Sequence, residues 1–289
     1  MKHLFTAITL AMMATCAYSV EPTVISLWDE IPAPSSNEIA PGSENASNPD
    51  WITGVSEPTV TVYPAEKPNG VTLLMCPGGA YFGLAGVHEG SAMAKDLNDN
   101  GYTLAVLKYR LPNGGHYQVP ADDARRAMTI LRQQADRFGI DPSRIGIGGA
   151  SAGGHLASTV ATHKVDGVDL PAFQLLYYPV ISMDNAITHK GSQENLLGKN
   201  PSAKLITFYS NELQVSPDTP PALILVSNDD DVVPVANSIK YFNALTENNV
   251  PTSLHIYPDG GHGWAFVPRF TYDRVSTEEI LQWLKQFTK

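Results

Sequence analysis

The sequence predicts an α/β fold in which a mainly parallel central sheet is flanked by helices on both faces. Three observations predict it. Apolar runs of strand length alternate with helical stretches along most of the chain, and repeated strand–helix units build parallel sheets with right-handed crossovers. Several of these runs are continuously apolar, as expected of strands covered on both faces. The length of 289 residues, 43% of them hydrophobic, is sufficient for one large domain with a substantial core.

The expected elements can be placed in order along the chain. Residues 59–63 alternate polar and apolar side chains, which predicts a half-exposed edge strand. Residues 71–76 form a continuous apolar run and predict a strand buried on both faces. Further strands are expected at residues 103–109, 145–148, 173–178, 222–227 and 252–257. Helices are expected at residues 91–100, 120–138, 154–161, 235–248 and 277–287.

Two segments do not follow this alternation. Residues 20–55 are rich in Pro, Ser, Asn and Glu and predict an irregular N-terminal arm laid over the domain. Residues 180–221 are polar and lie between two central strands, where insertions usually shape the mouth of a pocket. Because neither a linker nor an internal repeat is visible, we expect residues 20–289 to form a single domain.

Residues 1–19 predict a secretory signal peptide. A short basic start precedes an apolar run at residues 4–14, and Ala17-Tyr18-Ser19 resembles a small-x-small cleavage site. The run is too short to span a membrane. We expect cleavage after Ser19 and a secreted or periplasmic protein with no membrane attachment. Lipid anchoring through Cys16 is the less favoured alternative, because the residues before it fit a lipobox poorly.

Charge and cysteine content restrict the possible partners. The net charge of −10 disfavours binding to nucleic acid or to an anionic membrane, whereas neutral or uncharged-polymer substrates fit it better. Once the signal is removed, Cys76 is the remaining cysteine. Neither an internal disulfide nor a cysteine metal cluster is therefore expected.

Residues 149–153 read Gly-Ala-Ser-Ala-Gly, the G-x-S-x-G pattern of a nucleophile elbow. A serine on so tight a strand-to-helix turn needs strained backbone angles and neighbours without a Cβ, which Gly149 and Gly153 supply. Since three fixed positions also recur by chance, the strand expected before Ser151 and the helix expected after it strengthen the match. The alternatives are a glycine-rich turn without chemistry and a dinucleotide-binding fingerprint starting at Gly146.

A serine hydroxyl is a weak nucleophile until a base takes its proton and a carboxylate orients that base. We expect His262 to be the base, because it lies on a glycine-rich turn after the last predicted strand. His155 is expected to support the elbow from the following helix. Other histidines fall in loops that can line the cleft, namely His88, His116 and His189, whereas His255 lies within a predicted strand.

The acid is expected from the run Asn228-Asp229-Asp230-Asp231. Asp230 fits the D-x-x-V-P spacing of hydrolases of this type, and Asp229 and Asp231 remain alternatives. The run is also compatible with a solvated turn or with an N-terminal cap for the next helix, and we expect one of the three aspartates to have one of these two roles. The order Ser, Asp, His along the chain is that of α/β-hydrolases.

An ester-cleaving site also needs backbone N–H donors for the negative charge of the tetrahedral intermediate. We expect Ala152 to supply one, and Gly79 and Ala80 the others, because glycine allows the backbone to approach a substrate. A plain tight turn is the alternative. Three side chains are expected to line the substrate cleft: Tyr81, His88 and Trp264.

These motifs occur together at residues 76–81 (CPGGAY), 88–90 (HEG), 107–112 (LKYRLP), 149–153 (GASAG), 232–234 (VVP) and 260–263 (GGHG). In this combination the chain resembles secreted bacterial acetyl esterases associated with xylan breakdown, from about residue 57 to the last helix. Such proteins are α/β-hydrolases that remove O-acetyl groups from xylose units without metal or cofactor. The resemblance implies a triad of Ser151, Asp230 and His262. Two features depart from the pattern: Ala80 replaces a usual third glycine, and the turn around Asp230 is unusually acidic.

The sequence therefore predicts a serine carboxylester hydrolase that deacetylates xylan or xylo-oligosaccharides through an acetyl-serine intermediate. No cofactor, metal or nucleic-acid partner is expected, and the oligomeric state is left open. One alternative is an esterase for feruloyl or short-chain lipid esters; the lack of a long apolar lid disfavours a lipase. A serine peptidase of the same fold is disfavoured because no propeller domain is present. A non-catalytic carbohydrate-binding or structural protein is the third alternative.

Overall fold

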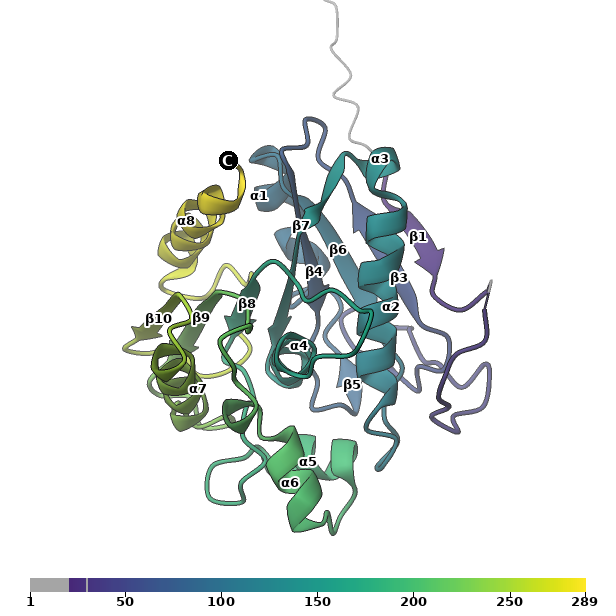
Figure 1. Ribbon diagram of the computed structural model, residues 1–289, viewed down its shortest axis with the longest axis vertical. Coiled ribbons are helices and arrows are strands. Elements are labelled where there is room, and N and C mark those ends of the chain that lie inside the picture. Colours follow the sequence, from purple (N-terminus) through teal and green to yellow (C-terminus); the bar gives the residue numbers. More distant parts are fainter. Residues whose placement is uncertain (1–20, 30) are drawn as a thin grey trace, which may run out of the picture.

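The computed structural model describes residues 21–29 and 31–289 (Figure 1). The predicted signal, its cleavage site and Cys16 lie outside the described residues, so these expectations stay predictions. Within the described ranges, no helix has the length and apolar character needed to cross a membrane.

An eight-stranded sheet forms the centre of the molecule, in the order β1-β3-β6-β4-β7-β8-β9-β10. Strand β3 runs antiparallel to both of its neighbours, β1 and β6, and all other neighbouring strands are parallel. The strands are β1 (Thr23–Ser26), β3 (Thr59–Tyr63), β4 (Gly70–Cys76), β6 (Thr103–Lys108), β7 (Ile140–Ala150), β8 (Gln174–Tyr177), β9 (Ala222–Ser227) and β10 (Thr252–Tyr257). A second, two-stranded sheet pairs β2 (Ile52–Thr53) with β5 (Gly83–Leu84).

Helices cover both faces of the central sheet (Figure 1). They are α1 (Ala94–Asp99), α2 (Val119–Gln133), α3 (Ala135–Phe138), α4 (Ala152–Thr162), α5 (Lys190–Leu197), α6 (Ala203–Tyr209), α7 (Ala236–Glu247) and α8 (Asp273–Leu284). One hydrophobic cluster lies under α2, α4 and α7, and a second lies under α1 and α8. Helices on both sides of a mainly parallel sheet confirm the predicted fold class.

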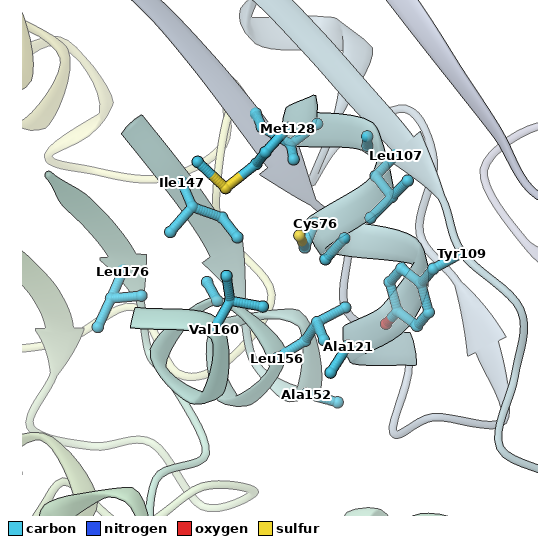
Figure 2. Close-up of a cluster of buried hydrophobic side chains, with 14 of the residues drawn as sticks. Cys76, Leu107, Tyr109, Ala121, Met128, Ile147, Ala152, Leu156, Val160 and Leu176 are labelled. Carbon is cyan, nitrogen blue, oxygen red and sulfur yellow. The ribbon is translucent and has the colours of Figure 1, made fainter. Parts of the chain in front are cut away.

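Strand β4 shows why the sheet sequence is so apolar. Its residues alternate between the two clusters: Leu74 and Cys76 join the first, and Leu73 and Met75 the second. Figure 2 shows the first cluster, where Cys76 lies among side chains from α2, α4 and the neighbouring strands. Because both faces are covered, nearly every position of the strand is buried and most carry an apolar side chain, with Thr72 as a buried polar exception, so the period-two pattern disappears.

Three expectations about the elements need correction. Strand β3 is not the sheet edge, because β1 pairs with it from Thr23↔Val62 to Ser26↔Thr59. The arm predicted to be irregular therefore contains a strand, which is too short, at four residues, to show alternation. The long helix expected at residues 120–138 is divided at Gln134, whose φ of −103° and ψ of 20° interrupt the helix.

The arm is fixed to the domain by buried side chains. Leu27 is fully buried, and the indole N–H of Trp28 donates to Asp123 Oδ1 over 2.7 Å. The same carboxylate binds Arg110 through several short contacts, and Arg110 in turn donates to the Ser35 carbonyl. The arm thus packs on α2 through specific polar contacts.

Candidate active site

The turn at Ser151 joins β7 to α4 and has an unusual backbone. Ser151 has a φ of 53° and a ψ of −119°, a region that residues with a Cβ rarely adopt. A Cβ on Gly149 would collide with the backbone of Gly153, and one on Gly153 would collide with the Cys76 carbonyl. Both positions must therefore be glycine for β4, β7 and α4 to approach one another around the serine.

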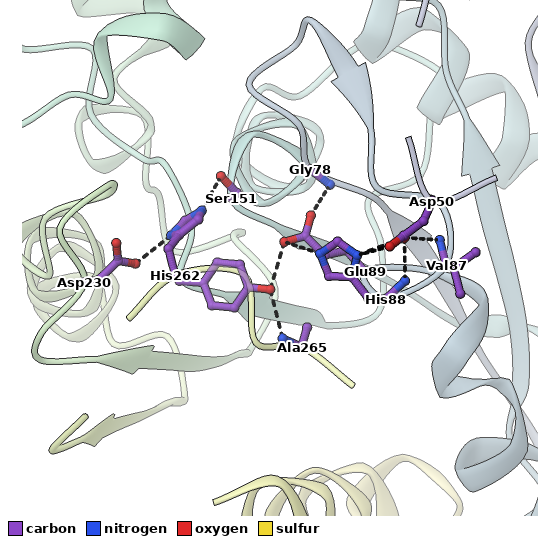
Figure 3. Close-up of polar contacts among 10 residues, drawn as sticks. Asp50, Gly78, Val87, His88, Glu89, Ser151, Asp230, His262 and Ala265 are labelled. Atoms are coloured by element: carbon purple, nitrogen blue, oxygen red, sulfur yellow. Dashed lines mark hydrogen bonds and ion pairs between the residues drawn. The ribbon is translucent and has the colours of Figure 1, made fainter. Parts of the chain in front are cut away.

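The structure brings Ser151, His262 and Asp230 into one hydrogen-bonded line (Figure 3). His262 Nε2 lies 2.9 Å from Ser151 Oγ, and His262 Nδ1 lies 2.7 Å from Asp230 Oδ2. Because an ionised carboxylate can only accept, Nδ1 carries the proton and Nε2 is free to accept one from the serine. The Asp230 side chain is fully buried, so water does not compete for this contact.

The three adjacent aspartates have different surroundings. Asp230 Oδ1 also accepts from the backbone N–H groups of Val232 and Val233, which fix the carboxylate. Asp229 accepts from Gly261 N–H over 2.8 Å, and Asp231 is exposed. None of the three caps α7, since its N-cap is Val235 without a side-chain hydrogen bond. The cap is therefore not formed, whereas the exposed Asp231 agrees with the other alternative, a solvated turn.

The loop after β4 passes directly beside the serine. A Cβ on Gly78 would lie 2.9 Å from Ser151 Cβ. Gly79 (φ 126°) and Ala80 (φ 55°) both have positive φ. Within residues 21–29 and 31–289, no acceptor pairs with the N–H groups of Gly79, Ala80 or Ala152, whereas Gly78 N–H donates to Glu89. The three N–H groups expected as oxyanion donors therefore have no acceptor within these residues, whereas the neighbouring Gly78 N–H has one.

The BD-FAE family profile matches residues 62–245, which is more than half of the chain. The chain belongs to the BD-FAE family. It is 41% identical, over 224 residues, to an acetylxylan esterase from Xylanibacter ruminicola, covering 76% of this chain and 46% of that protein. It is 34% identical, over 204 residues, to endo-1,4-beta-xylanase B from Butyrivibrio fibrisolvens, covering 66% of this chain and 32% of that protein. The chain therefore spans less than half the length of either relative.

A solved structure matches over nearly its whole length. The acetyl ester-xyloside bifunctional hydrolase from Caldicellulosiruptor lactoaceticus aligns with a TM-score of 0.76 and 34% identity, covering 91% of this chain and 96% of that chain. Together with the strand order, this likeness confirms the α/β-hydrolase fold.

His155 supports the elbow of this BD-FAE protein from within. It is fully buried. Its Nε2 donates to the Tyr209 carbonyl over 2.8 Å, so its Nδ1 accepts from the Tyr81 hydroxyl, also over 2.8 Å. Burial lowers the pKa of His155 to about 4, which keeps the ring neutral near pH 7. The helix α4 is thereby connected to the loop after β4.

Two of the side chains expected to line the cleft are largely buried. Tyr81 is 2% exposed and directs its hydroxyl to His155. Trp264 is 3% exposed and stacks on Phe270, with ring centroids 4.0 Å apart. The prediction that Trp264 presents a surface to substrate is therefore corrected, because its ring completes buried aromatic packing. Tyr81 does contribute to the lining of a groove, and its contact with substrate stays a prediction.

The remaining loop histidines lie around the site rather than in it. His88 Nδ1 is 2.8 Å from Asp50 Oδ1. His189 caps α5 by accepting from Ser192 N–H. The pKa of His189 is lowered, mainly by burial and to a smaller extent by the charge of His262. His116 faces Glu38, and His255, which lies on β10, faces Glu279. Contact of His88 with substrate stays a prediction.

Two buried residues in the site were not expected from the sequence as functional groups. Glu89 accepts from Gly78 N–H and from the Tyr178 hydroxyl, each over 2.8 Å. Tyr178 also accepts from Ala265 N–H over 3.0 Å, and its ring lies 4.6 Å from that of His262. The one available signal was the position of Glu89 in the His-Glu-Gly motif.

A groove of about 500 Å³ begins at the loop after β4. The arm contributes Thr53 to its lining, and the segment at residues 180–221 contributes Asn195. Phe82 lines it as well and is 61% exposed. Asn195 Nδ2 also donates to the Ala80 carbonyl over 2.9 Å.

In the part of the chain that the structure describes, no group of three or more His, Cys, Asp or Glu side chains is placed to hold a metal ion.

Proposed function

We propose that the protein is a serine carboxylester hydrolase that removes O-acetyl groups from xylan or xylo-oligosaccharides. The observation that carries the proposal is the hydrogen-bonded line from Ser151 Oγ through His262 to Asp230. The likeness to an acetylxylan esterase supports the substrate class, and so does the likeness to an acetyl ester-xyloside hydrolase. In this proposal Asp230 is the carboxylate that orients His262, whereas Asp229 holds the loop that carries His262 by accepting from Gly261 N–H.

In the first half-reaction, His262 Nε2 takes the Ser151 proton as Oγ attacks the acetyl carbonyl carbon. Negative charge develops on the carbonyl oxygen, and the unoccupied N–H groups of Gly79, Ala80 and Ala152 stabilise it. The bond to the sugar oxygen then breaks, and that oxygen receives the proton from His262. The products are an acetyl-serine and a free sugar hydroxyl.

In the second half-reaction, water attacks the acetyl-serine while His262 accepts its proton. The tetrahedral intermediate uses the same N–H donors, and its collapse returns the proton to Ser151 and releases acetate. Asp230 holds the proton on Nδ1 throughout and offsets the charge of the imidazolium. Loss of one oxyanion donor typically costs on the order of 3 kcal/mol of transition-state stabilisation.

The sugar chain is proposed to lie in the groove beside Phe82. The groove starts one residue beyond the proposed oxyanion donors and presents an exposed ring next to amide and hydroxyl groups. Such a surface suits a pyranose, which has apolar faces and polar edges. Its partner in this proposal is an acetylated plant polysaccharide or oligosaccharide.

The test is release of acetate from acetylated xylo-oligosaccharides, measured beside hydrolysis of p-nitrophenyl acetate, butyrate and ferulate. Acetate release that disappears in Ser151→Ala is the expected result. Hydrolysis of p-nitrophenyl acetate without acetate release would refute the substrate class, and preference for ferulate or butyrate would indicate the other esterases. Absence of covalent labelling by a fluorophosphonate, with no turnover of any ester, would indicate a non-catalytic protein.

Residues 1–19 are proposed to direct export to the periplasm or the medium. N-terminal sequencing of protein recovered from a bacterial host tests this, with Val20 as the expected first residue. Recovery of the protein with residue 1 intact, or with a lipid on Cys16, would contradict it.

A further inference from the structure

We propose that Glu89 is a positioning residue that holds the loop after β4 and the loop carrying His262 in one arrangement, and whose negative charge favours proton transfer to His262. The inference rests on the proposed esterase function and deepens it by adding a group that touches neither the serine nor the substrate. The argument has three parts: the burial of the carboxylate, its two connections, and the charges around it.

Glu89 is a buried acid with a small set of partners. The residue is 3% exposed, and burying a carboxylate is costly unless each oxygen is hydrogen-bonded. Oε2 accepts from Gly78 N–H and Oε1 from the Tyr178 hydroxyl. Both partners donate, which is the pattern for an ionised carboxylate, because a protonated acid would need an acceptor of its own.

The first connection fixes the loop that carries the proposed oxyanion donors. Gly78 immediately precedes Gly79, and a Cβ on Gly78 would lie 2.5 Å from Glu89 Oε2 and 2.9 Å from Ser151 Cβ. The Gly78 peptide is therefore enclosed between the carboxylate and the elbow. Movement of Glu89 would shift the first peptide of this loop, and errors of about 1 Å in such positions reduce rates by about 100-fold.

The second connection fixes the histidine loop. The Tyr178 hydroxyl donates to Glu89 and accepts from the N–H of Ala265, three residues after His262. Tyr178 itself has a φ of 34°, a strained conformation that only surrounding contacts maintain. Through Tyr178, one carboxylate thus joins loops that follow β4, β8 and β10 (Figure 3).

Few charged or titratable groups lie around Glu89 and His262 in the described part of the chain. Asp230 binds His262 Nδ1, and the charge of His262 contributes to the lowered pKa of His189. Glu89 is faced by His88, whose Nε2 lies 3.9 Å from Oε1, and His88 is paired with Asp50. Burial raises the pKa of Glu89, and the charges of His88 and His262 and the Tyr178 hydrogen bond act against this rise. When His262 takes the serine proton, it becomes a cation near two buried carboxylates rather than one.

The test compares Glu89→Gln, Tyr178→Phe and the double variant by kcat, KM and pH profile on p-nitrophenyl acetate, with thermal melting beside them. Each single variant is expected to lose roughly 10- to 100-fold in kcat with KM within about twofold. The double variant is expected to be no worse than the poorer single variant, because both break the same connection. In Glu89→Gln the acidic limb of the kcat/KM profile is expected to move to lower pH, since a negative charge near the base is removed.

A matched control is Glu279→Gln. Glu279 accepts from the Tyr257 hydroxyl and faces His255, so it has the same kind of partners as Glu89 but lies on α8, outside the site. This control is expected to keep wild-type kcat and pH profile. The inference is overturned by wild-type kcat in either single variant, by losses that multiply in the double variant, or by an unmoved acidic limb in Glu89→Gln. If Glu89→Gln does not fold, Tyr178→Phe decides alone, with unchanged kcat refuting the connection. Failure of the wild-type protein itself to cleave the ester would instead refute the proposed function.

Discussion

The Tyr81 hydroxyl donates to Nδ1 of His155 over 2.8 Å, so that the loop after β4 is held to the helix that begins after Ser151. The contact requires a neutral imidazole, because Nδ1 of a charged ring is a donor and cannot accept. The fold therefore depends on the protonation state of a residue that takes no part in the proposed chemistry.

Stability should accordingly fall in acid through His155. Its folded-state pKa of about 4 lies below the ordinary value of 6.5, so the unfolded chain binds the proton first. The contribution is fully present above pH 6.5 and is lost as pH falls toward 4, to a total on the order of 3 kcal/mol. Chemical denaturation of the wild type and His155→Gln at pH 7 and pH 4.5 measures it. The difference between the two proteins should shrink in acid, and a difference independent of pH would contradict this account.

Asp230→Asn should reduce kcat by about 10³- to 10⁴-fold on any ester that the protein cleaves. The amide would donate to His262 Nδ1 and leave the proton on Nε2, which then cannot accept from Ser151. Asp229→Asn is the matched control, since Asp229 lies next in sequence and its carboxylate accepts from the Gly261 backbone N–H rather than from His262. Its kcat should stay within about tenfold of wild type. Equal losses in both variants would argue against Asp230 as the sole acid.

Phe82→Ala should weaken binding of the glycan without affecting the chemistry. Losing a stacked aromatic surface is expected to raise KM for acetylated xylo-oligosaccharides by roughly tenfold, while turnover of p-nitrophenyl acetate stays unchanged. Phe208→Ala is the control, because Phe208 is also exposed, at 47%, but does not line the groove. Unchanged KM in Phe82→Ala would place the sugar elsewhere.

Ala80→Gly should stabilise the protein. Ala80 has a φ of 55°, which costs a residue with a Cβ about 1–2 kcal/mol. Glycine removes this cost, but part of the gain is offset by the greater freedom of glycine in the unfolded chain. A net increase of about 1 kcal/mol in the free energy of unfolding is expected, with kcat retained. The opposite sign is expected for Ala244→Gly inside α7, which should lose about 1 kcal/mol. Destabilisation by Ala80→Gly would show that its methyl group packs favourably.

The parts of the site that could be predicted from sequence are those encoded in short contiguous motifs. The positive φ of Ser151 and its flanking glycines follow from five adjacent residues. The Asp230 and His262 loops follow predicted strands β9 and β10, whose bounds agree with the structure. Strand ends of a parallel sheet meet at one edge, so these groups could be expected to converge.

What could not be predicted depends on contacts between distant segments. Glu89 binds Tyr178 across 89 positions of sequence, and no local pattern marks a carboxylate that will be buried. The inward orientation of Tyr81 and Trp264 arises from packing with His155 and Phe270. Strand β1 is recognisable only through its pairing with β3.

That pairing also bears on how the protein behaves in concentrated solution. Without residues 23–26, the outer edge of β3 would present its unpaired backbone groups along five residues, and such an edge invites other chains to add strands. On this side of the sheet, the edge of the intact protein belongs to β1, which is four residues long. Strand β1 provides none of the proposed catalytic groups, so removing residues 23–26 is expected to reduce solubility before it reduces catalysis.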